Sequence, residues 1–100
     1  MDAPLTLAGL TEELHLLLVN RDYEGGEELL SQALGLMPKH EAYLHFQLGK
    51  LYSNWNKMSS AVAHLGRAAE IAKLKDDEVL AVQIIEEFRN ARRRQAEQAP

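Results

Sequence analysis

The chain has 100 residues, of which 46% are hydrophobic and 26% are charged, and it contains no cysteine. This composition is typical of a folded chain with one modest core, and it excludes large two-domain enzymes, disulfide frameworks and thiolate chemistry. The formal net charge of −4 is unevenly distributed, because residues 1–41 hold eight acidic and two basic residues, whereas the remainder holds seven acidic and nine basic residues.

The N-terminal sequence MDAPLTLAGL has an acid where a secretory signal carries positive charge. The apolar run LHLLLV is far shorter than the ~20 residues that a membrane span requires. We therefore expect a cytoplasmic protein without a membrane span.

Two helices are predicted before Pro38. The first has leucines on one face and ends near Asn20: Leu10, Leu14, Leu17 and Leu18. The second begins at Asp22, a predicted N-cap, and has glutamates near its positive end. Pro38 ends it, because proline cannot continue a helix.

Three more helices are predicted after Pro38. The third begins near Glu41 and has one apolar stripe: Leu44, Leu48, Leu51, Tyr52 and Trp55. The fourth follows the turn NWNK, and Asp76 or Asp77 caps a fifth that carries Leu80, Ile84, Ile85, Phe88 and Ala91. Short turns favour antiparallel neighbours. We therefore expect an all-α domain over residues 1–95 and a frayed tail over residues 96–100.

Small residues interrupt the apolar stripes at Gly49, Ala61 and Ala68. Together with Leu48 and Tyr52, these residues resemble the tetratricopeptide repeat, TPR. His45, Leu65 and Lys73 depart from the family's Trp, aromatic and Pro, and a weaker copy over DYEGGEELLSQALGLMP precedes this unit. The resemblance covers roughly residues 7–75 and implies antiparallel helix pairs stacked as a short solenoid, with the fifth helix as a cap. Gly49, Ala61 and Ala68 would then be sites where helices pack closely.

The resemblance also implies a partner-binding inner face, lined by the first helix of each pair. Superposition of the first, third and fifth helices by their core residues places nine residues on this face: Glu12, Leu16, Val19, Phe46, Lys50, Ser53, Val82, Glu86 and Arg89. Four of them are apolar, and exposed apolar strips flanked by charges mark interaction sites. We expect Phe46, at the centre, to present its ring to a partner.

Candidate chemistry is scarce in the remaining sequence. His40 and His45 are five residues apart and diverge around a helix, so no metal site is expected. Neighbouring acids, such as Glu27 and Glu28, point in different directions on a helix. Gly25 and Gly26 lack the strand and the Lys-Ser/Thr of a phosphate loop. We therefore expect no catalytic residues, no cofactor and no enzymatic activity.

The basic run RNARRRQ, with Arg89 and Arg92–Arg94, has no aromatic platform between its cations. We interpret it as complementing the negative end of the last helix, and nucleic acid is not an expected ligand.

The sequence thus predicts a non-enzymatic adaptor or chaperone-like module that binds a helix or peptide of a partner protein. TPR domains that grip a terminal carboxylate use paired Lys and Asn, of which only Lys50 has a counterpart here. The partner should therefore offer apolar side chains. The alternative is a self-assembling structural protein, in which the acidic N-terminal part of one copy meets the basic tail of another.

Overall fold

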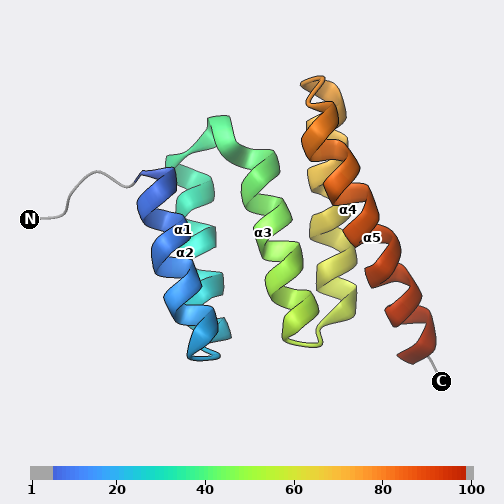
Figure 1. Ribbon diagram of the computed structural model, residues 1–100, viewed down its shortest axis with the longest axis horizontal. Coiled ribbons are helices and arrows are strands. Elements are labelled where there is room, and N and C mark those ends of the chain that lie inside the picture. Colours follow the sequence, from blue (N-terminus) through green and yellow to red (C-terminus); the bar gives the residue numbers. More distant parts are fainter. Residues whose placement is uncertain (1–5, 99–100) are drawn as a thin grey trace, which may run out of the picture.

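The computed structural model describes residues 6–98, which form five α-helices and one short 3₁₀ helix (Figure 1). In chain order these are α1 (Leu7–Val19), α2 (Tyr23–Leu36), η1 (Pro38–His40), α3 (Glu41–Asn54), α4 (Met58–Leu74) and α5 (Glu78–Gln98). Residues 6–98 contain no strand, so the prediction of an all-α fold with five helices is confirmed. Of the helices described, none combines the length and the apolar character needed to span a membrane.

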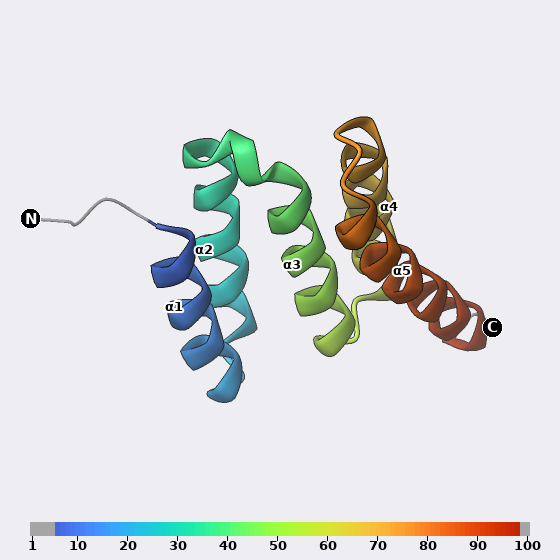
Figure 2. The same cartoon turned by 45° about the horizontal axis from the view of Figure 1, so that its top comes forward.

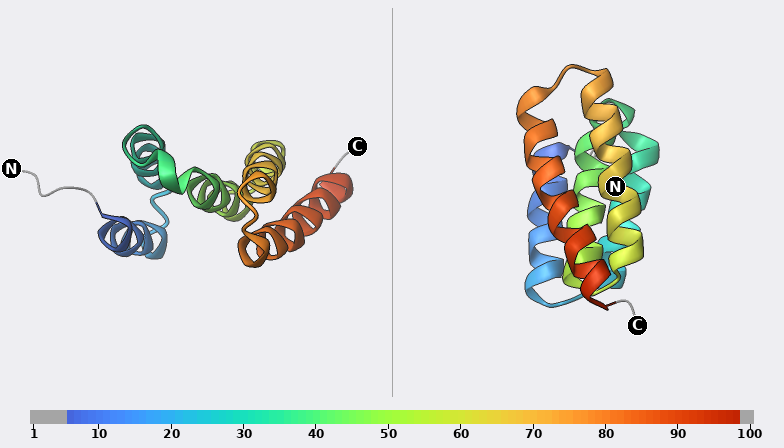
Figure 3. Two further views of the ribbon diagram at one scale, coloured as in Figure 1. Left: turned by 90° about the horizontal axis from the view of Figure 1, so that it is seen from above. Right: turned by 90° about the vertical axis from the view of Figure 1, so that its right-hand side faces the viewer.

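The helices follow one another in a thin, elongated slab. Successive helices run in opposite directions, with η1 bridging α2 and α3 (Figure 2). Seen from above, α1 and α5 lie on one side of the slab, α2 and α4 on the other, and α3 between them (Figure 3). The molecule measures 49 × 34 × 18 Å. Because a helix is about 10 Å across, the thinnest dimension corresponds to two helices.

Polar side chains at the predicted positions begin α2 and α5. Asp22 Oδ1 accepts a hydrogen bond of 2.9 Å from the Gly25 amide, as the sequence predicted. Asp77 Oδ1 accepts one of 3.1 Å from the Leu80 amide. Asp77 is therefore the N-cap that the sequence left open between two aspartates. Each bond satisfies an amide that has no partner within its helix.

Three of the interhelical turns share one backbone geometry. A single residue in the left-handed region lies in each turn: Arg21 (φ 57°), Asn56 (φ 62°) and Asp76 (φ 54°). The next amide bonds back across the turn, from Asp22 to the Leu17 carbonyl, from Lys57 to that of Tyr52 and from Asp77 to that of Ala72, at 2.8, 2.8 and 3.0 Å. These six-residue bonds satisfy the last carbonyls of α1, α3 and α4. The turns thereby reverse the chain within a few residues.

Helix α3 provides the centre of the core. Its leucines Leu44, Leu48 and Leu51 are at most 2% exposed, and they pack with apolar side chains from the other helices. A Cβ atom at Gly49 would lie 2.5 Å from Cγ of Leu65, well inside van der Waals contact. Ala61 and Ala68 of α4 are fully buried. The prediction that these three small residues are close-packing sites is confirmed.

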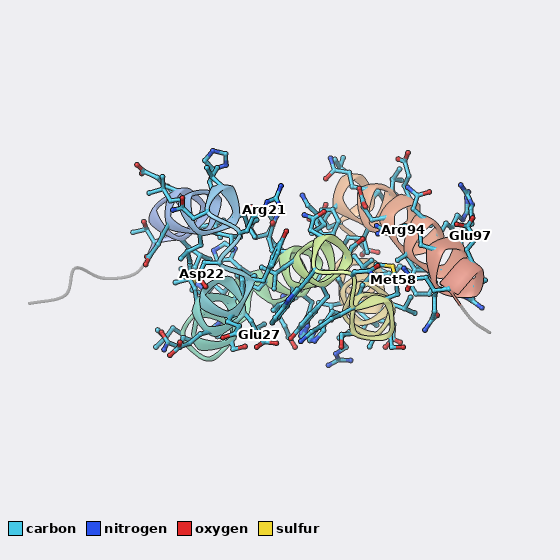
Figure 4. The ribbon with its side chains drawn as sticks, turned by 90° about the horizontal axis from the view of Figure 1, so that it is seen from below. Arg21, Asp22, Glu27, Met58, Arg94 and Glu97 are labelled. Carbon is cyan, nitrogen blue, oxygen red and sulfur yellow. The ribbon has the colours of Figure 1, made fainter. Side chains whose placement is uncertain are left out.

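The C-terminal half of α5 packs back against the turn between α3 and α4. Figure 4 labels Arg94 of α5 and Met58, the first residue of α4, at this end of the molecule. Three side-chain bonds join the two regions: Arg94 Nη1 to Ser53 Oγ (2.9 Å), Gln95 Nε2 to Ser59 Oγ (3.2 Å) and Gln98 Nε2 to Asn56 Oδ1 (2.6 Å). The expectation of a frayed tail is therefore wrong for residues 96–98, and residues 99–100 lie outside the described part of the chain.

Candidate protein-binding surface

Six of the nine residues predicted for the inner face are exposed. The apolar members Leu16, Val19 and Val82 are 58%, 65% and 65% exposed. The other exposed members are charged: Glu12, Glu86 and Arg89. Apolar side chains with more than half of their surface in water are available to a partner. Both the first and the last helix therefore present exposed apolar side chains.

The prediction for Phe46 is wrong. Its side chain is only 6% exposed and belongs to the core, and the Lys50 ammonium lies 4.9 Å from the centre of its ring. Superposition matched Phe46 with Glu12 and Val82, which lie on the outermost helices. Helix α3, in contrast, has α2, α4 and α5 close to its backbone. An outward position on this central helix is therefore enclosed by its neighbours, and Phe46 is a packing residue.

Ser53, at the other end of the predicted face, is also engaged within the molecule. Its hydroxyl accepts the hydrogen bond from Arg94, and its side chain is half-buried. This bond brings together a predicted site residue and the basic run, which the sequence treated separately. The C-terminal part of α5 thus covers this end of the inner face.

The remaining predicted residues do not line a single hollow. Val82, Glu86 and Arg89 share a shallow depression of about 560 Å³ with three further residues of α5: Ile85, Asn90 and Arg93. No residue of α1 or α3 lines it. The structure therefore divides the predicted face into an α5 part and an α1 part, which carries Leu16 and Val19.

A different hollow joins the first, third and fifth helices. It has a volume of about 380 Å³ and lies where α1, α3 and α5 begin, beside the end of α4. Its lining residues are Leu7, Lys39, His40, Ala42, Tyr43, Ala72, Lys75, Asp77, Val79, Leu80 and Gln83. We refer to it as the three-helix pocket. Its size lies near the lower end of the range of ligand pockets.

The sequence reasoning missed this pocket, although the signal was present. The same superposition that matched Phe46 with Val82 also matches Tyr43 with Val79, one helical turn nearer the start of each helix. The corresponding residue of α1 is Gly9, which has no side chain, and Leu7 is the α1 residue that lines the pocket. Tyr43 is half-buried and Val79 is 74% exposed, so the pocket offers apolar surface at its mouth.

The rim of the three-helix pocket is more basic than acidic. Lys39, His40 and Lys75 lie on it, whereas Asp77 contributes the only carboxylate among its lining residues. The Asp77 carboxylate also caps α5. The ion pairs found within residues 6–98 all involve Glu41 or Arg67, so none of them includes Lys39 or Lys75. An acidic group on a partner would therefore meet cations here.

Within residues 6–98, no three His, Cys, Asp or Glu side chains come together as ligands for a metal ion. Searches of protein-family models, of curated proteins and of solved structures found no match for this chain.

Proposed function

We propose that this chain is a small, non-enzymatic TPR-like interaction module in the cytoplasm, which binds an amphipathic helix or extended segment of a partner protein. The three-helix pocket carries the proposal, because it is the described hollow to which α1, α3 and α5 all contribute. One apolar side chain of the partner enters this pocket. Acidic residues of the partner approach Lys39 and Lys75 on its rim.

The exposed valines of α5 extend the binding surface beyond the pocket. Val79 lies at the pocket and Val82 lies one turn further along α5, and both side chains are largely exposed. A helix or strand that runs along α5 would bury both of them, and such burial contributes roughly 25 cal/mol per Å² of apolar surface. This arrangement is the groove mode of peptide recognition.

Photo-crosslinking followed by calorimetry tests the proposal. A photoreactive amino acid at Val79 should capture a partner in the native cells, whereas the same group at the exposed Ala63 of α4 should not. With the captured partner, Val79→Glu should weaken binding by about tenfold or more, as truncation of an interface hot spot does. Ala63→Glu introduces the same charge and should leave affinity unchanged. Equal affinities for both variants, with helicity intact by circular dichroism, would rule out the pocket as the site.

A second candidate function, self-assembly, is favoured by another hollow between α4 and α5. It has a volume of about 590 Å³, its floor includes Gly66 and Ala69, and three cations and one acid surround it: Lys73, Arg89, Arg92 and Glu70. The acidic N-terminal part of a second copy would complement this charge. Sedimentation velocity separates the two functions, because self-assembly predicts oligomers that dissociate as salt is added, whereas the adaptor remains a monomer.

A further inference from the structure

Five aromatic side chains from three helices form a continuous cluster that the proposed function does not use. We call it the aromatic cluster, and its members in order of contact are Tyr23, Trp55, Tyr52, His64 and His45, with neighbouring ring centres 5.7, 6.2, 5.3 and 5.3 Å apart. Tyr23 belongs to α2 and His64 to α4, while the other three belong to α3 or its C-terminal cap. The cluster therefore links α2, α3 and α4.

Two polar contacts hold the cluster together. The Tyr52 hydroxyl donates a hydrogen bond to the Glu27 carboxylate of α2. Burial, and after it this bond, raise the pKa of Tyr52 to about 12. The second contact joins Nδ1 of His45 to Nδ1 of His64 at 3.1 Å. Each helix junction in the cluster thus contains a titratable pair.

The two imidazoles meet edge to edge. Their ring centres are 5.3 Å apart and their planes differ by 24°, while the two Nδ1 atoms are 3.1 Å apart. When two ring nitrogens point directly at each other, the ring centres are farther apart than the nitrogens by one ring radius on each side. The distance between the centres exceeds the distance between the Nδ1 atoms by close to this amount, so each Nδ1 points toward the other ring. This geometry suits an N–H···N hydrogen bond. It requires one hydrogen between the nitrogens, so one Nδ1 donates and the other accepts.

The surroundings determine how this pair binds protons. Burial lowers the pKa of His45 below the ordinary value of 6.5. Positive charge on His64 and on Arg67 of α4 lowers this pKa further, whereas the Glu41 carboxylate raises it. The Glu41 Oε1 atom is 3.8 Å from His45 Nε2 and 3.8 Å from Arg67 Nη2. Burial likewise lowers the pKa of His64, against the attraction of Glu27. Both rings are therefore largely neutral at pH 7.

We propose that His45 and His64 form a proton-sensitive clasp between α3 and α4, which opens when the second imidazole is protonated. A neutral pair keeps one hydrogen between the Nδ1 atoms. A singly protonated pair keeps it too, because the imidazolium donates to the neutral ring, and Glu41 favours the cation on His45. When both rings are protonated, each Nδ1 carries a hydrogen. The bond is then lost and two cations face each other.

Opening of the clasp loosens the rest of the aromatic cluster. The His64 ring contacts Tyr52, whose hydroxyl is held by Glu27. A charged His64 attracts the same carboxylate, so it competes with Tyr52 for Glu27. Acidification thereby weakens the link between α2 and α3 as well as the link between α3 and α4.

The clasp predicts a loss of stability with acid. Because both folded-state pKa values are lower than the unfolded value of 6.5, the unfolded chain binds more protons below this pH. The contribution of the two neutral imidazoles to the free energy of unfolding is fully present above pH 6.5. It is lost as the pH decreases toward the folded-state pKa values. The melting temperature of the wild-type chain should therefore decrease from pH 7 to about pH 5.5, within the range in which histidine titrates.

Variants and nuclear magnetic resonance test the clasp separately. His64→Gln keeps a hydrogen-bonding side chain but cannot titrate, so it should make this decrease smaller, while buried His45 still contributes to it. His15→Gln and His40→Gln, at exposed histidines, should leave the decrease unchanged.

In the wild-type chain, long-range imidazole correlations at pH 7 should show Nδ1 protonated in one ring of the pair and unprotonated in the other. An unchanged pH dependence in folded His64→Gln, or independent titration of both wild-type rings near pH 6.5, would overturn the proposal. Should His64→Gln fail to fold, the wild-type spectra decide alone.

Discussion

At Gly49, the absence of a side chain determines how closely α3 and α4 pack. A Cβ atom there would lie 2.5 Å from Leu65 Cγ and 3.3 Å from the Leu65 backbone nitrogen. The side chain and the backbone of α4 would both have to move. Gly49→Ala should therefore lower the free energy of unfolding by about 1–3 kcal/mol, the cost of overpacking a core. Urea unfolding followed by circular dichroism measures this change.

Gly35 provides the matched control for Gly49. It also lies in a helix, α2, but a Cβ atom there meets no other atom within 4 Å. Gly35→Ala should leave stability unchanged or raise it by up to about 1 kcal/mol, since alanine favours the helix. A similar loss at both positions would contradict the packing explanation. The sequence identified Gly49 correctly because a small residue inside an apolar stripe indicates close approach of another helix.

At the scale of the helices, the repeated turn geometry stores backbone strain that glycine would relieve. Arg21 has φ 57°, a left-handed conformation that costs a residue with a Cβ about 1–2 kcal/mol. Arg21→Gly should therefore raise the melting temperature, with a gain in the free energy of unfolding of up to about 1 kcal/mol after the added flexibility of the unfolded chain is subtracted.

The neighbouring residue shows whether the gain comes from the backbone conformation. Asn20 has φ −85°, which any residue adopts, so Asn20→Gly should lower the melting temperature. Thermal unfolding of the two glycine variants in parallel makes the comparison. A loss of stability in Arg21→Gly would mean that contacts of the arginine side chain outweigh the strain.

Helix positions followed from local signals, whereas the left-handed backbone at Arg21 and the end of α5 did not. Apolar spacing and the caps at Asp22 and Asp77 are encoded within a few residues, and they predicted all five helices. Asn56 and Asp76 are of residue types that adopt the left-handed region more readily than most, but Arg21 is not, and no glycine marks any of the three positions. The extension of α5 to Gln98 depends on partners about forty residues earlier, which no local pattern reveals.

For the whole molecule, the exposure of a side chain depends on how many helices surround it. This explains why only part of the predicted inner face is exposed. The superposition treated equivalent positions of α1, α3 and α5 alike. Phe46 nevertheless lies on the central helix and is buried, while Leu16 and Val82 lie on the outer helices and are exposed. The three-helix pocket likewise arises from residues of four α-helices, of the 3₁₀ helix η1 and of the turn between α4 and α5. Such a surface is a property of the assembled stack, and helical periodicity alone does not predict it.

The serial arrangement of the helices has a consequence for motion. The backbone of α1 comes close only to that of α2, whereas α3 has three helical neighbours. Each amide's protection reflects the free energy of the smallest opening that exposes it. Amide hydrogen exchange should therefore be fastest in α1 and slowest in α3 and α4, and mass spectrometry of peptic fragments measures these rates. Uniform protection across the five helices would instead indicate one cooperative unit.

Opening of α1 alone removes Leu7 from the three-helix pocket and leaves its α3 and α5 walls in place. A ligand that contacts Leu7 would then slow exchange in α1, and its binding would be coupled to the local folding of the first helix.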